Sequence, residues 1–409
     1  MINQQIPEYP IVYVNNSRIG KIAVGWGCHT TVGNECKEAG IRKALIVTTG
    51  LRGTGIVDEI KSILSYHGIS VEVYDKVTSN PKDYQVMEGY QAFKAAGCDG
   101  VVSVGGGSSH DCGKAIRVVD ANDGRHISEF ALKKDKPPEL MAKTNPIKKN
   151  QIAVNTTAGT GAENSFGAAY TNTAVQPRLK ELAVAPAGLP CFTSLSDPLL
   201  IRCQPSRIAA GTAFDALTHA TEAYLSRINS EVSKALAYRA VKMISENIRE
   251  FAYNRMNSVA AENICWSNTL GSSLGLSSGA GAGITHGLSH GVSGNCDIHH
   301  GYANMVVMVP TQRYNQPVCP DRFAELAEAM GVDIRQMTRI KASDRWFEEI
   351  ERMLKDLNVE IGHLNKQFGF KKEYCGFLVK EQYGNDLCSI GNPQDYNYEE
   401  IVKLYESMV

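Results

Sequence analysis

Four of the ten histidines fall between residues 286 and 300, at His286, His290, His299 and His300. His286 and His290 are four residues apart. Upstream, Asp215 and His219 repeat that spacing, which puts both members of each pair on one face of a helix. Three imidazoles and one carboxylate suit a divalent cation such as Fe²⁺ or Zn²⁺. A single histidine is better explained as a hydrogen-bonded core residue. The cluster favours a metal, because several imidazoles buried together without a ligand are costly.

Two loops rich in glycine and small hydroxyl residues could bind a phosphate. Residues 104–111 (Val-Gly-Gly-Gly-Ser-Ser-His-Asp) follow an expected strand and open an expected helix, where backbone N–H groups favour an anion. The loop matches neither GxGxxG nor the P-loop, so a simple tight turn explains it equally well. Residues 155–163 form a second such loop, a weak signal by itself.

The elements expected to position these loops alternate along the first half of the chain. Apolar runs predict strands over 42–48, 71–74, 100–104 and 152–155, with helices over 54–66, 82–97 and 109–120. This alternation predicts a parallel sheet with helices on its faces. Residues 121–150 are expected to form a polar loop. An apolar segment at 182–186 precedes a proline-punctuated crossing at 186–206.

The second half has helical periodicity over 207–226, 230–252, 257–277 and 321–330. A stretch of small residues at 272–283 suits close helix packing or the approach of a ligand. We therefore expect an α/β dinucleotide-binding domain over 1–192 and an all-helical metal-binding domain over 193–409. A cleft between them would place a metal, acting as a Lewis acid, opposite a dinucleotide.

Composition excludes several classes of protein. The 42 basic and 43 acidic residues leave a formal charge of −1, which argues against nucleic acid as a partner. No apolar run approaches the thickness of a bilayer, and the first residues lack the pattern of a signal peptide. The eleven scattered cysteines include no CxxC, which favours free thiols in a reducing cytoplasm.

In colinear order, these motifs resemble the group III iron-containing alcohol dehydrogenases. The resemblance rests on Gly-Gly-Gly-Ser at 105–108, Thr-Thr-Ala-Gly-Thr-Gly at 156–161, Asp215-x3-His219, His286-x3-His290, His300-Gly301 and Asn392-Pro393. Within that family the chain looks similar to the nicotinoprotein-type methanol dehydrogenases, in the stretches 48–53, 74–77 and 79–84 and in the doubled His299-His300.

The resemblance implies the fold named above, a nicotinamide cofactor, and one divalent ion, with Fe²⁺ ahead of Zn²⁺. It implies that the metal ligands are Asp215, His219, His286 and His300, and that His290 is catalytic without binding the metal. The expected cofactor-binding residues are Thr49, Asn80, Gly106, Gly107, Ser108, Asp111, Thr156, Thr157, Thr160 and Lys180.

One departure from the family bears on the nucleotide. Many NAD-preferring members carry an aspartate where this chain has Thr49, and Arg52 follows closely. Without that carboxylate a 2′-phosphate is not repelled, so we expect NADP to be accepted beside NAD.

The expected reaction is hydride transfer between a nicotinamide and a short primary alcohol or its aldehyde, by a cytoplasmic homo-oligomer. The stretches 214–222 and 279–301 contain no Lys or Arg, which favours neutral substrates. Residues 166–170 could add an apolar wall to the substrate site near the expected metal. Lys180 and Arg227 lie outside these stretches and could reach in, so a reductase of an anionic aldehyde such as sulfoacetaldehyde stays an alternative. A dehydroquinate synthase-like lyase and a non-catalytic NAD(P) sensor are further alternatives.

Overall fold

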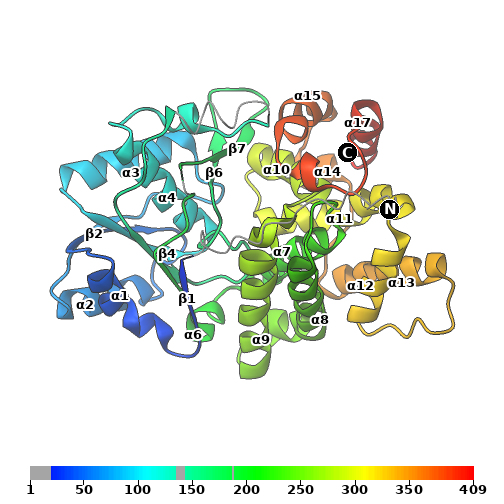
Figure 1. Ribbon diagram of the computed structural model, residues 1–409, viewed down its shortest axis with the longest axis horizontal. Coiled ribbons are helices and arrows are strands. Elements are labelled where there is room, and N and C mark those ends of the chain that lie inside the picture. The colour runs from blue at the N-terminus through cyan, green and yellow to red at the C-terminus, as the bar shows by residue number, and fades with distance from the viewer. Residues whose placement is uncertain (1–19, 135–142, 187) are drawn as a thin grey trace, which may run out of the picture.

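The computed structural model describes residues 20–134, 143–186 and 188–409. Figure 1 shows two lobes side by side, one built on a sheet and the other on helices. The expected fold class, an α/β domain followed by an all-helical domain, is confirmed.

The first lobe contains a six-stranded parallel sheet in the order β1-β8-β5-β4-β2-β3. Its strands are β1 (Lys21–Val24), β2 (Lys43–Thr48), β3 (Ser70–Tyr74), β4 (Gly100–Gly105), β5 (Gln151–Asn155) and β8 (Thr193–Ser196). β4 and β5 are buried along their whole length, because helices cover both faces of the sheet. The carboxyl ends of β4 and β5 therefore deliver both glycine-rich loops to the same edge.

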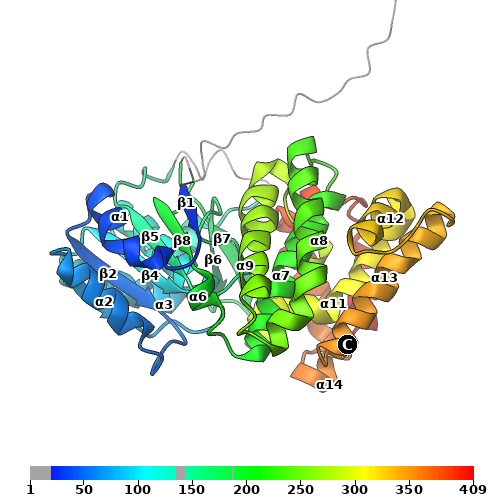
Figure 2. The same cartoon turned by 90° about the horizontal axis from the view of Figure 1, so that it is seen from below.

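Helices pack on both faces of this sheet, as the strand–helix alternation predicts. The helices α1 (Val32–Glu38) and α2 (Ile56–Tyr66) share one buried cluster with Ile46 and Val102. The helices α3 (Asp83–Ala95) and α4 (Gly107–Ala121) share another with Leu45 and Val101 on the opposite face. Figure 2 shows the same arrangement from below.

Three expectations need correction in this lobe. The expected crossing at 186–206 contains strand β8 and helix α6 (Pro198–Ile201), so the sheet extends beyond the expected domain boundary at residue 192. β8 reads Thr-Ser-Leu-Ser and shows no apolar run, and the apolar run of β1, Ile-Ala-Val, is only three residues long. The expected loop at 121–150 includes a 3-10 turn, Ile127–Phe130, although its residues 135–142 lie outside the described part.

An antiparallel hairpin, β6 (Ala168–Asn172) and β7 (Leu179–Ala183), forms a second sheet. The expected apolar wall at 166–170 is therefore wrong for Tyr170. Its ring is fully buried in the core against α3 and α4, and its hydroxyl donates to Glu181 at 2.5 Å. β7 instead places Lys180 beside the site described below.

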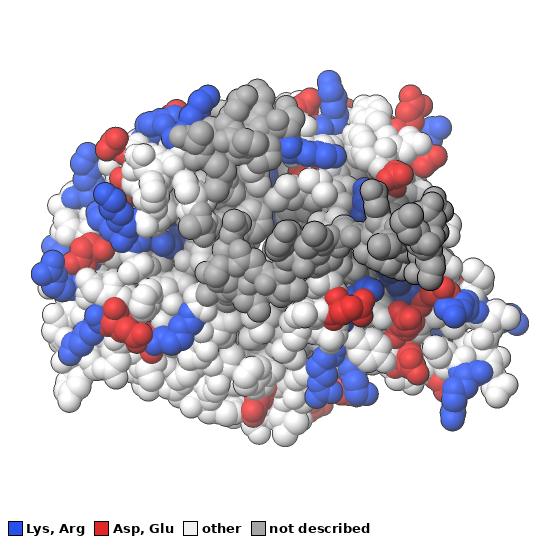
Figure 3. Space-filling model, in the orientation of Figure 1, with Lys and Arg blue, Asp and Glu red and all other residues white. Residues whose placement is uncertain are grey.

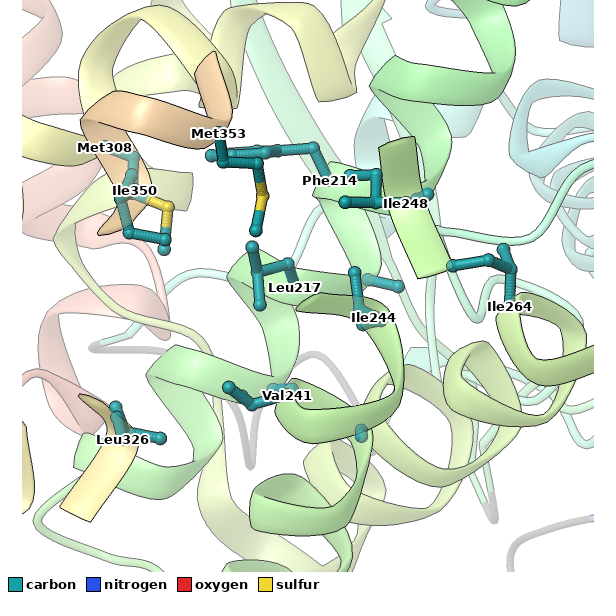
Figure 4. Packing of buried hydrophobic residues seen from close by; sticks show 14 of the residues in the cluster. Phe214, Leu217, Val241, Ile244, Ile248, Ile264, Met308, Leu326, Ile350 and Met353 are labelled. Carbon is teal, nitrogen blue, oxygen red and sulfur yellow. The ribbon is translucent and has the colours of Figure 1, made fainter. Parts of the chain in front are cut away.

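The second lobe is built around α7 (Ser206–Leu225), with α8 (Glu231–Tyr253) and α9 (Ser258–Asn268) packed beside it. The helix expected over 257–277 changes type after Asn268 and continues as a π-helix, Thr269–Ala280. π-helices are rare in proteins, and those that do occur are often found at functional sites. Figure 4 shows the core between these helices, where Phe214 and Leu217 of α7 meet Ile244 and Met353.

The remaining helices complete this lobe. They are α10 (Ile284–Cys296), α11 (His300–Asn315), α12 (Pro320–Ala329), α13 (Arg339–Asp356), α14 (Leu364–Phe368), α15 (Cys375–Glu381), α16 (Cys388–Gly391) and α17 (Tyr398–Ser407). Short 3-10 turns at 28–31, 316–318, 372–374 and 383–385 join elements in the two lobes. Among the described residues, no helix is long and apolar enough to cross a membrane. On the face drawn in Figure 3, basic and acidic side chains are interspersed.

Candidate metal and cofactor site

Helix α7 carries the first part of the site on a face that is buried from solvent. Asp215, His219 and Glu222 follow one another at intervals of four and three residues, so their side chains lie along one face. Asp215 is fully buried, and His219 is only 7% exposed. A carboxylate this deep in a helical core needs either a cation or several donors.

The other imidazoles reach Asp215 from α10 and α11. The Oδ1 atom of Asp215 is 3.5 Å from Nε2 of His286 and 3.8 Å from Nε2 of His300. The ring of His219 stacks on that of His286 with a centroid distance of 4.2 Å. The structure thus brings together all four residues expected to bind the metal, and ligand atoms of Asp215, His219 and His286 lie within 4.8 Å of one another.

The donor set fits a divalent cation. The Nδ1 atom of His219 is bonded to the carbonyl oxygen of Gly159 at 3.2 Å, and that of His286 to Glu222 at 2.5 Å. These contacts leave the Nε2 atoms as the metal-binding nitrogens, although Nε2 of His286 also lies 3.4 Å from the amide nitrogen of Asn304. Asn304 donates to Oδ1 of Asp215 at 2.7 Å, whereas the buried Oδ2 has no partner among the described residues.

Electrostatics around these residues favour a positive charge. Burial alone would lower the pKa of His286, but the carboxylates of Glu222 and Asp215 raise this pKa to about 9. Burial lowers the pKa of His219 to about 4, and it lowers that of His300 well below its usual range. The two buried carboxylates, Asp215 and Glu222, thus hold a positive charge on His286 when no metal is present, and the same charges would attract a divalent cation.

His290 lies beside this group and has its own carboxylate. Its ring stacks on that of His300 with a centroid distance of 5.1 Å, and its Nδ1 lies 3.2 Å from Oδ2 of Asp386. Burial lowers the pKa of His290. A cavity of about 60 Å³, lined partly by Asp386 and Lys180, opens between β7 and residues 381–387. His290 therefore has a partner for its Nδ1–H, and that partner borders a space large enough for water.

The adjacent residues His299 and His300 lie at the start of α11 and have different surroundings. His299 immediately precedes the helix, and its Nδ1 lies 3.1 Å from where a Cβ would stand on Gly211. That Nδ1 has no hydrogen-bond partner among the described residues. Neither His299 nor His300 belongs to the three-residue group of potential ligands around Asp215, but Nε2 of His300 lies 3.8 Å from Oδ1 of Asp215.

The two glycine-rich loops pack against each other at the carboxyl edge of the sheet. A Cβ on Gly106 would lie 2.6 Å from Oγ1 of Thr157, and one on Gly107 would lie 2.7 Å from Thr160. Larger residues are therefore excluded by the neighbouring loop itself. Thr157, Thr160 and Ser108 are half-buried, and α4 begins at Gly107, so the helix amino terminus and these hydroxyls lie at one edge.

The second loop also contacts His219, one of the expected metal ligands. Besides the bond from His219 to Gly159, Ser272 of the π-helix donates to the same carbonyl at 2.7 Å. A Cβ on Gly159 would lie 2.3 Å from the carbonyl oxygen of Thr212 on α7. The loop expected to hold the cofactor is therefore in contact with the helix that carries Asp215. Thr156, at the start of that loop, is buried.

Three residues expected to bind the cofactor make protein contacts of their own. Asn80, with a φ of 53°, donates to the carbonyls of Ser293 and Ile298, bridging the two lobes. The carboxylate of Asp111 pairs with the buried Lys114 at 2.9 Å. Lys180 approaches Oδ1 of Asn80 at 3.5 Å, and burial lowers its pKa to about 8.

The two arginines singled out from the sequence are both engaged elsewhere. Arg52 binds Oδ2 of Asp75 through two nitrogens, at 3.2 and 2.9 Å, and Thr49 is half-buried at the end of β2. Arg227 donates to the carbonyls of Ile390 and Ser389 and pairs with Asp395. Arg227 is therefore held by α16 and the segment that follows it rather than extended into the site.

Sequence reasoning missed Glu222, Asn304 and Asp386. Glu222 lies three residues after His219, so its helical register was visible, but acidic residues on helices are common and usually solvated. Asn304 and Asp386 reach the site from segments distant in sequence from their partners. Asn304 lies four residues after His300 on α11, so its place beside an expected ligand was visible in the spacing, whereas no local spacing connects Asp386 to His290.

Comparison with known proteins agrees with this arrangement. Residues 20–191 match the model described as iron-containing alcohol dehydrogenase, and residues 209–409 match the carboxyl-terminal model of the Fe-containing alcohol dehydrogenase family. The chain belongs to the iron-containing alcohol dehydrogenase family, and it is an oxidoreductase of that class. The family implies a divalent metal and a nicotinamide cofactor, for which the Asp215 group and the glycine loops provide suitable residues.

Three relatives illustrate the range of the family. A methanol:N,N-dimethyl-4-nitrosoaniline oxidoreductase from Rhodococcus erythropolis is 35% identical, the match covering 99% of this chain and 98% of that protein. A NAD-dependent methanol dehydrogenase from Bacillus methanolicus is 31% identical over 94% of this chain and 97% of that protein. A solved 1,3-propanediol oxidoreductase is 33% identical with a TM-score of 0.85, covering 96% of this chain and 98% of that one.

Proposed function

We propose that this protein is a metal-dependent, NAD(P)-linked dehydrogenase of short primary alcohols, working in reverse as an aldehyde reductase. The observation that carries the proposal is the convergence of Asp215, His219, His286 and His300 at a point where His219 also contacts the second glycine loop. Metal ligands and cofactor loop are thereby brought together.

The chain's own residues orient the substrate and handle its proton. When bound, a divalent ion supplies a Lewis acid for a hydroxyl group, and a nicotinamide supplies a two-electron acceptor. His290 holds or releases a proton at Nε2, because its Nδ1–H is occupied by Asp386. The hydroxyls of Ser108, Thr156, Thr157 and Thr160 bind the cofactor, with Gly106 and Gly107 allowing close approach.

The native ion is proposed to be Fe²⁺, one per chain, with Zn²⁺ as the alternative. Three imidazoles and one carboxylate suit both ions, so the donor set alone favours neither. Elemental analysis of protein purified without oxygen tests this proposal. Less than half an equivalent of any divalent metal in active protein would contradict it.

The proposed substrates are small and neutral, from about one to four carbons. Residues 214–222 and 279–301, which carry the ligands, contain no Lys or Arg, and Arg227 is engaged with residues 389–395. The names of the relatives, which include methanol and 1,3-propanediol, support the same size class. Extra methylenes change binding by only about 1–3 kcal/mol each, so activity should vary gradually along the series.

Lys180 is the residue that favours a second candidate, a reductase of short anionic aldehydes. Burial lowers its pKa to about 8 against the opposing effect of nearby carboxylates such as Asp111 and Asp386, so at neutral pH it carries a charge that could bind a sulfonate. Specificity constants for methanol, ethanol, propanol, butanol and 1,3-propanediol should be compared with that for sulfoacetaldehyde. A value at least a hundredfold higher for the sulfonate than for every neutral compound would replace the first proposal with this one.

For the nucleotide, we propose that NADP(H) is accepted as well as NAD(H). Thr49 offers no carboxylate to repel a 2′-phosphate, although Arg52 is paired with Asp75 and would have to exchange that partner. The nucleotide released on denaturing purified protein, together with titration by NADH and NADPH, tests this. Tight binding of NADH with no binding of NADPH would contradict it.

A further inference from the structure

Glu222 is a buried carboxylate on α7 whose two oxygens are both occupied. Its side chain is 2% exposed. Oε2 accepts from the backbone N–H of Gly283 at 2.7 Å and lies 2.5 Å from Nδ1 of His286. Oε1 accepts from the backbone N–H of Thr285 at 2.7 Å and from Gln312 at 3.3 Å. One side chain therefore joins α7 to both the backbone and the histidine of α10.

These contacts place α10 as well as the ring of His286. The N–H groups of Gly283 and Thr285 belong to the amino-terminal turn of α10 and have no carbonyl partner within that helix. Asn392 accepts from the next N–H, that of Ile284, at 3.2 Å. A Cβ on Gly283 would lie 3.0 Å from Oε1 of Glu222, so the helix start fits closely around this carboxylate.

The geometry also fixes which nitrogen of His286 faces Asp215. When the neutral imidazole donates Nδ1–H to Glu222, its lone pair is on Nε2, and this atom lies 3.5 Å from Oδ1 of Asp215. A carboxylate behind a ligating imidazole holds the ring in place and makes its metal-binding nitrogen more basic. His219 has only the neutral carbonyl of Gly159 in the equivalent position.

We propose that Glu222 is a positioning residue of the metal site, which holds His286 with Nε2 toward Asp215 and thereby sets the affinity for the ion. The proposal rests on the metal site of the proposed function. In this proposal Glu222 does not bind the ion itself. Its carboxylate affects metal binding only through His286.

The test measures metal binding rather than turnover. Metal-free wild-type protein and the Glu222→Gln variant are titrated with Co²⁺, and the visible absorption of the bound ion is recorded. In either orientation of the new amide, its NH2 group faces an N–H donor, and the negative charge is lost. We expect Co²⁺ affinity to fall about 10- to 100-fold, with a changed absorption spectrum.

The matched control is Glu349→Gln, which alters another glutamate in the helical lobe, 8% exposed and paired with Arg352 on α13. Its affinity and spectrum should equal those of the wild type. Wild-type affinity and spectrum in folded Glu222→Gln protein would overturn the proposal and leave Glu222 as a helix cap only. If the wild type itself binds no Co²⁺, the proposed metal site fails instead.

If the Glu222→Gln variant does not fold, a second measurement tests the proposal on wild-type protein. Wild-type protein containing ¹⁵N-labelled histidine is loaded with Zn²⁺, and the signals of His286 are assigned by comparison with a His286→Gln sample. We expect a proton on Nδ1 of His286 and none on Nε2. A proton on Nε2 would overturn the proposal, because that nitrogen would then face Asp215 as a donor.

Discussion

Asp215, His219 and His286 are almost wholly buried, whereas Ser108, Thr157 and Thr160 in the glycine loops are half-buried. The first group consists of charged and titratable side chains, and several have a further protein partner behind them. The second group consists of backbone turns and hydroxyls that pack against one another. The helical lobe thus builds its part of the site from charged and titratable side chains, and the sheet lobe builds its part from backbone turns and small hydroxyl side chains.

This difference predicts how strongly a substitution in each part should affect binding and stability. Removing a buried ligand leaves uncompensated charge on its neighbours, so its effect should be large. Removing one hydroxyl from a cradle made mostly of backbone N–H groups should cost about 1 kcal/mol. The predictions below use this contrast, beginning with the greatest expected effect.

Replacing His300 by Ala should remove the ion and abolish turnover while the fold is kept. His300 lies 3.8 Å from Asp215 and is the ligand that we propose from α11. Metal content by elemental analysis, kcat and circular dichroism check this. His299→Ala is the control and should keep its ion. A full equivalent of metal in the His300→Ala variant would contradict the assignment.

Replacing Gly301 by Ala should separate α7 from α11. The new Cβ would lie 2.0 Å from the carbonyl oxygen of Gly211 and 3.2 Å from Cβ of Asp215. Backbone cannot move aside cheaply, so we expect a loss of about 1–3 kcal/mol in the free energy of unfolding. Metal affinity should fall with it. Urea unfolding and metal content are the measurements.

Gly294→Ala provides the comparison for that variant. Gly294 also lies inside a helix, but the nearest atom to its Cβ would be 3.9 Å away, on Thr171. Alanine there should raise stability by roughly 0.5–1 kcal/mol, because it is the better helix former. Equal stability of the two variants would mean that the α7–α11 contact does not constrain the site.

The Thr49→Asp variant tests the expected nucleotide-binding part of the site, in the sheet lobe. A carboxylate at the end of β2 should shift the preference toward NAD(H) by roughly 1–2 kcal/mol of differential binding, through a new hydrogen bond to ribose and repulsion of a 2′-phosphate. Dissociation constants for NADH and NADPH measure it. Asp75→Asn, which releases Arg52, should shift the preference the other way. No shift in either variant would exclude this edge from nucleotide selection.

The smallest effect is expected far from the ligands, at His29. Its Nδ1 lies 2.5 Å from Asp197 and its Nε2 3.2 Å from Glu59, and the hydrogen bond with Asp197 raises its pKa. A raised pKa stabilises the fold fully below the unfolded value of about 6.5, and this contribution is lost as the pH rises through the folded value. The melting temperature of wild type should therefore fall above about pH 6.5 more steeply than that of His29→Gln. Parallel profiles would refute this.

The four proposed metal ligands could be predicted from the sequence for different reasons. Asp215 and His219 share a helix, so spacing alone connects them. His286 and His300 were joined to them by the resemblance to a family, because no local rule brings α10 and α11 onto α7. Strands β1 and β8 escaped detection, since a Thr-Ser-Leu-Ser segment shows no hydrophobic run. The start of α7 and the carboxyl ends of β4 and β5 were predicted closely because their patterns are long or strongly apolar.

The sequence by itself determined the two lobes, the parallel sheet, and the residue types able to bind a divalent ion and a dinucleotide. These follow from periodicity and side-chain chemistry, which are local properties of the chain. Only the tertiary structure decided which groups support the ligands. Glu222 meets His286 across 64 positions, and Asp386 meets His290 across 96. Contacts so distant along the chain depend on helix packing, so the partners of the ligands became visible only once α7, α10 and the carboxyl-terminal segment were in place.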